Sequence, residues 1–270
     1  NQPSDAGQCA AIGAGGDVAY VREAPCSQLN DGLTPDAAKC TLTDGLALNK
    51  RYVRLLGGTY AVAANTVDIG AGRAQAIVGA PGATSDVAKL NLDGPLKVTG
   101  AGARLYIDQV DLTQQRSDTA VVACSGGELV LRGSRLRGTT TAAAGLKSAA
   151  VDLASCTALI QRNQIGVEKA SDMGSHNDGV RFTGSGGTVS MPSFVHGCIF
   201  GTNGLNHSDN GTILSTASSV LNGIAMTGVR ARSTTGWDNT DTFTLPRPND
   251  GFNDRVLSCS FAFENLLTLN

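Results

Sequence analysis

Aromatic residues, charged residues and long apolar runs are all scarce in this chain of 270 residues. Charged residues make up 16% of it, against roughly 25% in an average globular protein, and aromatic residues make up 4%. A formal net charge of −2 provides no basic field to attract a phosphate backbone, so nucleic acid is not expected as a partner. No apolar run reaches the roughly 18 residues of a membrane span. The 34 glycines instead suit many short strands joined by tight turns.

The seven cysteines indicate the compartment. Together with few lysines and many small polar residues, they favour an oxidising environment, and we therefore expect a secreted or cell-surface protein. The chain begins with Asn rather than Met and carries no visible signal peptide, which suggests a mature secreted chain or an excised piece. Because seven is odd, at least one thiol must stay free or pair outside the chain.

Short strands recur at nearly constant spacing. One column of equivalent positions, with steps of 29 to 33 residues, is Val121, Val151, Val180, Ile213 and Phe243. A second column, with steps of 24 to 35 residues, is Val110, Ser134, Asn163, Cys198, Val229 and Cys259. In this second column the segments 105–112 and 129–136 each look like one continuous strand. Two columns that advance together are typical of a repeat protein, in which each unit buries its apolar side chains against its neighbours.

The N-terminal part has the features of a cap. Residues 17–22 alternate like a strand, and an Asn-Asp-Gly turn follows at 30–32. Thr34 and Pro35 then form a helix-start signal, which predicts a helix over 35–48. Such a helix would cover the first strands, whose exposed edge would otherwise invite aggregation.

Residues 52–60 form a strand pattern that ends in Gly-Thr-Tyr. With the initial strand, the Asn-Asp-Gly loop and the capping helix, this segment resembles secreted bacterial right-handed parallel β-helices of the pectin-lyase-like type. The resemblance implies an all-β solenoid, and at the observed repeat length residues 51–270 would hold about seven coils. We expect a flexible leader at 1–16 and one domain at 17–270, with the strand and cap at 17–50. A β-sandwich or an antiparallel barrel is the alternative fold.

Cysteine positions suggest two disulfides. Cys124 and Cys156 follow equivalent strands one unit apart, so the register brings them within bridging distance. Cys26 and Cys40 flank the turn and the predicted helix and could staple the cap, with Cys9 as a competing partner for either. The remaining two, Cys198 and Cys259, lie two units apart, which is too far for a disulfide. The chain has no Cys-x-x-Cys pair, so no zinc site is expected.

A polar residue recurs in the turn before the first strand column, at steps of 30 to 32 residues: Asp118, Ser148, Asp178, Asp209 and Asp241. Around this column lie two of the three histidines and the one tryptophan: His176, His207 and Trp237. Asp178 and Asp209 could act as paired carboxylates, with His176 or His207 as a general base. The candidate ligand-binding residues are Trp237, Asp241, Asn177 and Arg181. No cofactor is expected, although paired aspartates could hold Ca²⁺.

The alternative interpretation of the column is structural, because Asp and Asn side chains bond the local backbone in turns. The Asp-Asp pair and the Gly-His-Gly expected of polygalacturonase-like members are missing, so the resemblance implies no complete catalytic set. A further group, Arg132, Arg135, Arg137 and Arg162, is either a solvated face or a basic surface for an anionic polymer.

These patterns predict an exported surface β-helix with a structural or carbohydrate-binding, adhesin-like role, whose partner is a polysaccharide or another surface component. The alternative is a polysaccharide lyase or glycoside hydrolase. A trimeric fibre segment would need a flat apolar outer face. Homo-oligomer contacts or further coils are expected at the C-terminal end, which has no obvious polar cap.

Overall fold

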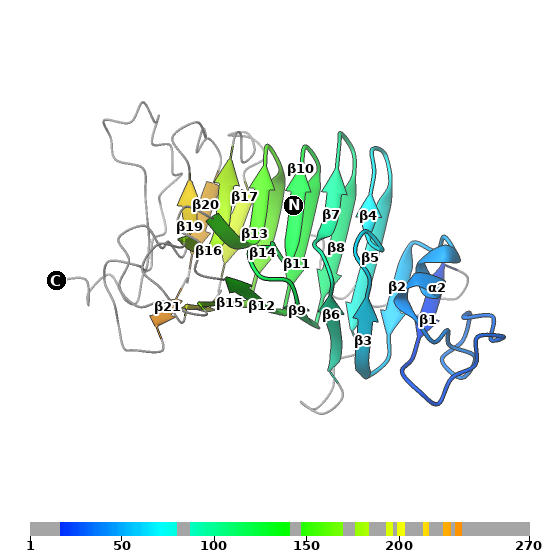
Figure 1. The fold of residues 1–270 in the computed structure, drawn as a ribbon. Coiled ribbons are helices and arrows are strands. Elements are labelled where there is room, and N and C mark those ends of the chain that lie inside the picture. The colour runs from blue at the N-terminus through cyan, green and yellow to red at the C-terminus, as the bar shows by residue number, and fades with distance from the viewer. Residues whose placement is uncertain are drawn as a thin grey trace, which may run out of the picture.

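The computed structural model describes residues 17–79, 87–140, 147–169, 176–183, 193–196, 199–202, 213–215, 224–227 and 230–233. Within these residues the chain is mostly β-strands in parallel sheets, with one short α-helix. The strands lie side by side along the long direction of the molecule, from β1 and α2 at one end to β19, β20 and β21 at the other (Figure 1). This arrangement confirms the all-β, parallel character predicted from the repeat.

Three sheets account for the strands. Sheet A contains β1 Val18–Val21, β2 Tyr52–Leu55, β5 Ala74–Gly79, β8 Arg104–Asp108, β11 Glu128–Arg132, β14 Thr157–Gln161, β17 Ser193–His196 and β20 Ile224–Thr227. Sheet B contains β3 Gly58–Val62, β6 Ala88–Leu92, β9 Val110–Gln114, β12 Arg135–Thr140, β15 Gln164–Lys169, β18 Ile199–Thr202 and β21 Arg230–Ser233. Sheet C contains β4 Asp68–Ile69, β7 Leu96–Thr99, β10 Val122–Ser125, β13 Lys147–Ala154, β16 His176–Thr183 and β19 Ile213–Ser215.

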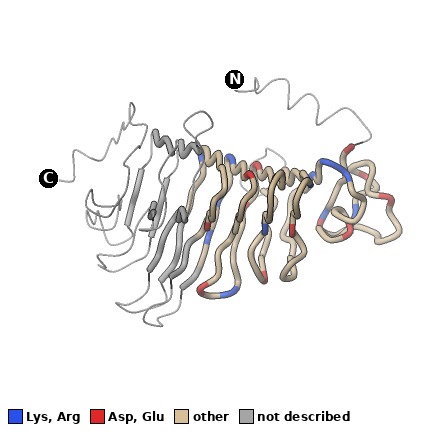
Figure 2. The backbone as a smooth tube through the Cα atoms, turned by 90° about the horizontal axis from the view of Figure 1, so that it is seen from above, with Lys and Arg blue, Asp and Glu red and all other residues tan. Residues whose placement is uncertain are grey.

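From β2 onward the chain visits sheets A, B and C in that order, so that every third strand pairs in parallel. We call three such consecutive strands a unit. Each unit contacts the unit before it and the unit after it, as a repeat architecture requires. Seen from above, residues of both charge signs are interspersed along the described units (Figure 2).

The core is aliphatic because alternate strand residues point inward from all three sheets. The largest fully buried side chains include Leu55, Ile77, Leu90, Leu96, Leu105 and Ile107. Burying a side chain of this size stabilises a fold by roughly 1.5–3 kcal/mol. The core therefore runs through successive units as one apolar column.

The corner between sheets A and B corrects one prediction. The segment 105–112 is not one strand but two, β8 and β9, which belong to different sheets. The chain turns at Gln109, which has φ of 56°, and the equivalent residues Gly133 and Arg162 have φ of 57° and 54°. An apolar-polar alternation on both sides of the corner hides this single left-handed residue from a pattern search.

The predicted registers are largely correct. Leu105 pairs with Leu129, as expected for the second column. In the first column Val151 pairs with Val180, and Val180 with Ile213. Val121 is wrong by one residue, since Val122 is the partner of Val151. Both valines are fully buried, which explains why hydrophobicity alone could not distinguish them.

The predicted helix over 35–48 is wrong in its first half. The helix is α2, Leu42–Ala47, and its N-cap is Thr41, whose hydroxyl accepts a hydrogen bond from the backbone N–H of Asp44 at 3.1 Å. Residues before it extend along β1, with a parallel bridge between Val21 and Lys39. Thr34 accepts a hydrogen bond from the N–H of Ala37 at 3.2 Å, which makes a turn rather than a helix start.

Both predicted disulfides are present. Cys26 is bonded to Cys40 beside the N-terminal strand, with Cα atoms 5.4 Å apart. Cys124 is bonded to Cys156 across adjacent units, with Cα atoms 6.0 Å apart. Both sulfurs of the second bridge belong to buried residues. The other predicted cysteine positions, Cys9, Cys198 and Cys259, lie outside the described residues.

Candidate binding surface

The outer face of sheet B is the most polar of the three sheet faces among the described side chains. Its outward residues alternate with buried, mainly apolar residues and stack in register from one strand to the next. The first row is Thr59, Lys89, Asp111, Arg135 and Gln164. The second row is Ala61, Asn91, Thr113 and Arg137. We call these two rows the sheet B face.

The spacing on the sheet B face is regular because the strands impose it. Side chains within a row lie about 4.8 Å apart, and the two rows lie roughly 6.6 Å apart along each strand. Asn91 and Thr113 supply both donors and acceptors, and Arg137 supplies donors. Asp111 lies 4.0 Å from Arg135, measured from Oδ2 to Nη1. Apart from Ala61, the face is therefore a repeating grid of hydrogen-bonding side chains.

The basic group predicted from sequence is partly assembled beside this face. Arg135 and Arg137 are exposed on the sheet B face, and Arg162 is exposed at the corner with sheet A. Arg132 lies on sheet A instead, with its Nε 3.6 Å from Oδ2 of Asp108. Three of the four arginines thus border one surface, while the fourth is paired on another.

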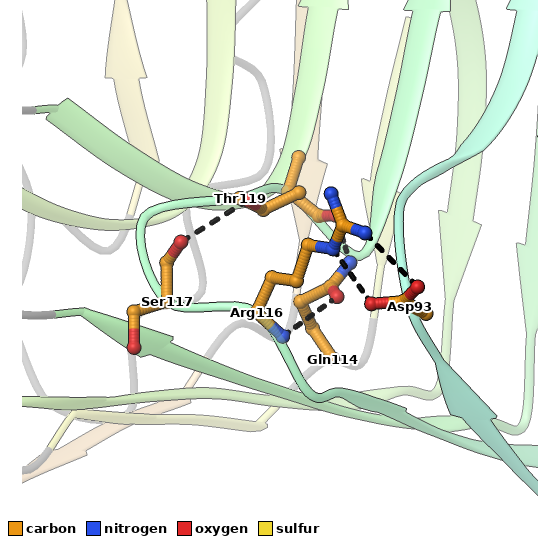
Figure 3. Close-up of polar contacts among 6 residues, drawn as sticks. Asp93, Gln114, Arg116, Ser117 and Thr119 are labelled. Carbon is orange, nitrogen blue, oxygen red and sulfur yellow. Dashed lines mark hydrogen bonds and ion pairs between the residues drawn. The ribbon is translucent and has the colours of Figure 1, made fainter. Parts of the chain in front are cut away.

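The connection from sheet B to sheet C forms one edge of the sheet B face (Figure 3). Nε and Nη2 of Arg116 lie 2.6 and 3.0 Å from the two carboxylate oxygens of Asp93, one unit earlier. The Arg116 guanidinium, mainly through these hydrogen bonds, holds the pKa of Asp93 below its ordinary value. Behind the pair, buried Gln114 donates to the carbonyl of Ala120 at 2.8 Å and accepts from the N–H of Arg116 at 3.0 Å.

The ion pair between Asp93 and Arg116 did not emerge from the sequence patterns. The two residues stand 23 positions apart in the chain, close to the length of one short unit. A search for opposite charges separated by one repeat length would have found them. The side chains are each 56% exposed, so the pair ties two connections together at the surface rather than inside the core.

The structure places the predicted site residues as follows. His176, Asn177, Asp178 and Arg181 all lie in β16, so the expectation that Asp178 occupies a turn is wrong. Ser148 pairs with Asn177 and not with Asp178, which pairs with Ala149. Asp118 does lie in a turn, with a left-handed φ of 57°. Four further predicted residues lie outside the described part of the chain: His207, Asp209, Trp237 and Asp241.

Neither a metal centre nor a known relative defines the site. Within the described residues no group of three or more His, Cys, Asp or Glu side chains could hold a metal ion. No described helix has the length and hydrophobicity needed to cross a membrane. Comparisons with protein-family models, with curated proteins and with solved structures found no match. Functional inference therefore depends on the chain's own residues.

Proposed function

We propose that this chain is an exported right-handed parallel β-helix, with about seven coils and an N-terminal capping helix, that binds polysaccharide without cleaving it. The recurring passage through sheets A, B and C supports the coil arrangement. The two disulfides are compatible with a secreted or cell-surface location. The proposed domain spans 17–270, with the leader at 1–16.

The observation that carries the binding role is the pair of polar rows on the sheet B face. An extended polysaccharide repeats its hydroxyl groups at short, regular intervals. A grid with one polar side chain about every 4.8 Å can meet such a ligand at several successive sugars. Thr113 and Asn91 suit neutral hydroxyls, whereas Arg137 also suits a carboxylate or sulfate.

Binding is favoured over catalysis by the composition of this face. General acid-base cleavage of a glycosidic bond uses two carboxyl groups on opposite sides of the bond. Among the described side chains in the two rows, Asp111 is the one carboxylate, and it lies beside Arg135. The proposed role is therefore that of a structural or adhesin-like surface protein.

The test is a panel of neutral and acidic polysaccharides, with and without Ca²⁺, in which both binding and released sugar ends are measured. The variant Asn91→Ala/Arg137→Ala should bind at least about 10-fold more weakly, because two grid positions lose their hydrogen bonds to the ligand. The matched control is Lys97→Ala on the outer face of sheet C, which should bind like the native protein.

Two results would contradict this proposal. One is the absence of binding to every polysaccharide by the folded native protein. The other is release of reducing or unsaturated sugar ends that disappears in Asp178→Ala/Asp209→Ala. The second result would assign the chain to the lyases or hydrolases instead.

A further inference from the structure

The outer face of sheet A carries an unbroken apolar row. Along the six sheet A strands from β1 to β14, register places one small, aliphatic or aromatic residue of each strand in this row: Val18, Tyr52, Ala76, Tyr106, Val130 and Leu159, of which Val18 and Ala76 are each 5% exposed. The inward residues of the same strands, such as Ile107 and Leu131, already form the core. Tyr106, Val130 and Leu159 are partly exposed on the opposite face. Both faces of this sheet therefore have apolar residues, as in sheets that are covered on both sides.

The residues that flank the apolar row are matched within each strand. On four consecutive strands, the residue two positions before the row complements the residue two positions after it. The pairs are Ala74 with Val78, Arg104 with Asp108, Glu128 with Arg132, and Thr157 with Gln161. Two pairs are oppositely charged, one is apolar and one is neutral and polar.

This matching is what a twofold symmetric contact requires. A twofold axis that runs along the apolar row lays each strand antiparallel on the same strand of a second copy. The residue two positions before the row on one copy then faces the residue two positions after the row on the second copy. Arg104 then faces Asp108 of the partner subunit, whose side chain is 8% exposed beside Arg132, and Glu128 faces Arg132 of the partner subunit, whose side chain is 25% exposed. From these observations we infer that the sheet A face is a homodimer interface, which leaves the sheet B face open.

Ion pairs within one subunit hold the charged side chains on the sheet A face. Nε of Arg104 lies 2.9 Å from a carboxylate oxygen of Glu128, and Nε of Arg132 lies 3.6 Å from Asp108. Charges therefore alternate in sign both along the face and across the twofold axis. Tyr106 donates a hydrogen bond to Asp108 at 3.0 Å, which directs its ring along the same face.

The size of the face agrees with a dimer of moderate affinity. Eight strands about 4.8 Å apart, each contributing four to six residues at about 3.3 Å, cover roughly 600 Å² on each copy. The total of roughly 1,200 Å² is at the lower end of stable protein interfaces. Area alone does not determine affinity, so the micromolar range is where we expect dissociation and where it has to be measured.

The test is sedimentation equilibrium across the micromolar range for the native chain and for Arg104→Glu/Glu128→Arg. This double variant keeps an ion pair within each subunit, but it sets the carboxylate introduced at position 104 against Asp108 of the partner subunit. Because like charges that face each other across an interface strongly oppose association, dimerisation should weaken by at least about 100-fold. The matched control, Asp93→Arg/Arg116→Asp, swaps an exposed pair away from this face and should dimerise like the native chain.

Each outcome decides the inference. A native dimer that the first swap dissociates and the second leaves intact supports it. A native chain that stays monomeric throughout the micromolar range overturns it, as does a dimer that both variants preserve. If the first swap impairs folding, Val130→Lys provides an independent test at the centre of the row. The inference does not depend on polysaccharide binding, so failure of one proposal leaves the other standing.

Discussion

Two edges of the molecule each join one unit to the next, but with different kinds of polar group. At the corner between sheets A and B the groups are neutral and buried. Asn163 accepts from the N–H of Ser134 at 2.9 Å and donates to the carbonyl of Leu131 at 2.8 Å, while Ser134 accepts from the N–H of Val110 at 3.2 Å. At the connection from B to C the contact between successive units is charged and exposed, Asp93 with Arg116, while buried Gln114 bonds only within its own connection among the contacts described above.

The difference concerns what is lost when a partner is removed. A buried backbone group that loses its hydrogen bond cannot turn to water, so its full desolvation cost remains. An exposed charge that loses its partner is solvated again at once. We therefore expect the A-B corner to contribute much more to stability than the B-C edge, even though the latter has the stronger isolated contact.

The largest effect is expected for Asn163→Ala. This change leaves the N–H of Ser134 without the partner that Asn163 provides in a buried site, takes one hydrogen bond from the carbonyl of Leu131, and also removes side-chain packing. We expect a loss of about 3 kcal/mol in the free energy of unfolding, measured by chemical denaturation. Gln164→Ala, on the exposed neighbour, is the control and should change stability by less than about 0.5 kcal/mol. Equal losses of stability in the two variants would contradict the expected difference between buried and exposed polar groups.

A second buried polar group should be detectable through pH. The hydroxyl of Tyr60 lies within hydrogen-bonding distance of the carbonyls of Leu56 and Val21, the latter at 3.2 Å, and accepts from the N–H of Glu23 at 3.1 Å beside the N-terminal strand. Burial is the main reason that its pKa is raised to about 12. The native protein therefore holds the phenol proton more tightly than the unfolded chain does. Its stabilising contribution is complete below pH 10, the ordinary phenol pKa, and is lost as pH rises through about 12.

The measurement for Tyr60 is the difference in unfolding free energy between the native protein and Tyr60→Phe. That difference should be largest near neutral pH and should shrink steadily between the two pKa values. A difference that stays constant throughout the alkaline range would show that Tyr60 is not protected by burial.

At the A-B corner, substitutions at two equivalent positions with left-handed backbone conformation should change stability in opposite directions. Gly133 has φ of 57°, and a Cβ there would meet atoms no closer than 3.4 Å, so Gly133→Ala is opposed by backbone conformation rather than by a clash. We expect it to destabilise by about 1 kcal/mol. Arg162 has nearly the same conformation, and Arg162→Gly should be neutral or slightly stabilising. Thermal unfolding of both variants tests the pair, and a destabilising Arg162→Gly would contradict the equivalence.

Periodicity predicted most of the strand order because parallel stacking repeats the same burial pattern in every unit. Register and the disulfide between Cys124 and Cys156 followed from that repeat. What the pattern could not distinguish were local events that leave hydrophobicity unchanged. The corner at Gln109 and the one-residue shift at Val121 are two of these.

The candidate surfaces were harder to predict than the fold. The recurrence of acidic residues predicts a column of turn aspartates, yet Asp178 lies within β16. The apolar row through Tyr106 and Val130 was not detected because its members are separated by a full unit in the chain. Only register shows that they are neighbours.

The smallest effect is expected at the B-C edge, for Arg116→Ala. Both partners are 56% exposed, so the free energy of unfolding should fall only slightly, and added salt should reduce that loss further. Because Arg116 lowers the pKa of Asp93, the pair stabilises above the ordinary carboxyl pKa, and this contribution is lost as pH falls through the lowered value. Gln114→Ala, which exposes no charge but removes a buried amide from the same connection, should cost more in chemical denaturation. If Arg116→Ala instead proved the more damaging change at neutral pH, exposure would not be what determines the cost of losing a polar contact.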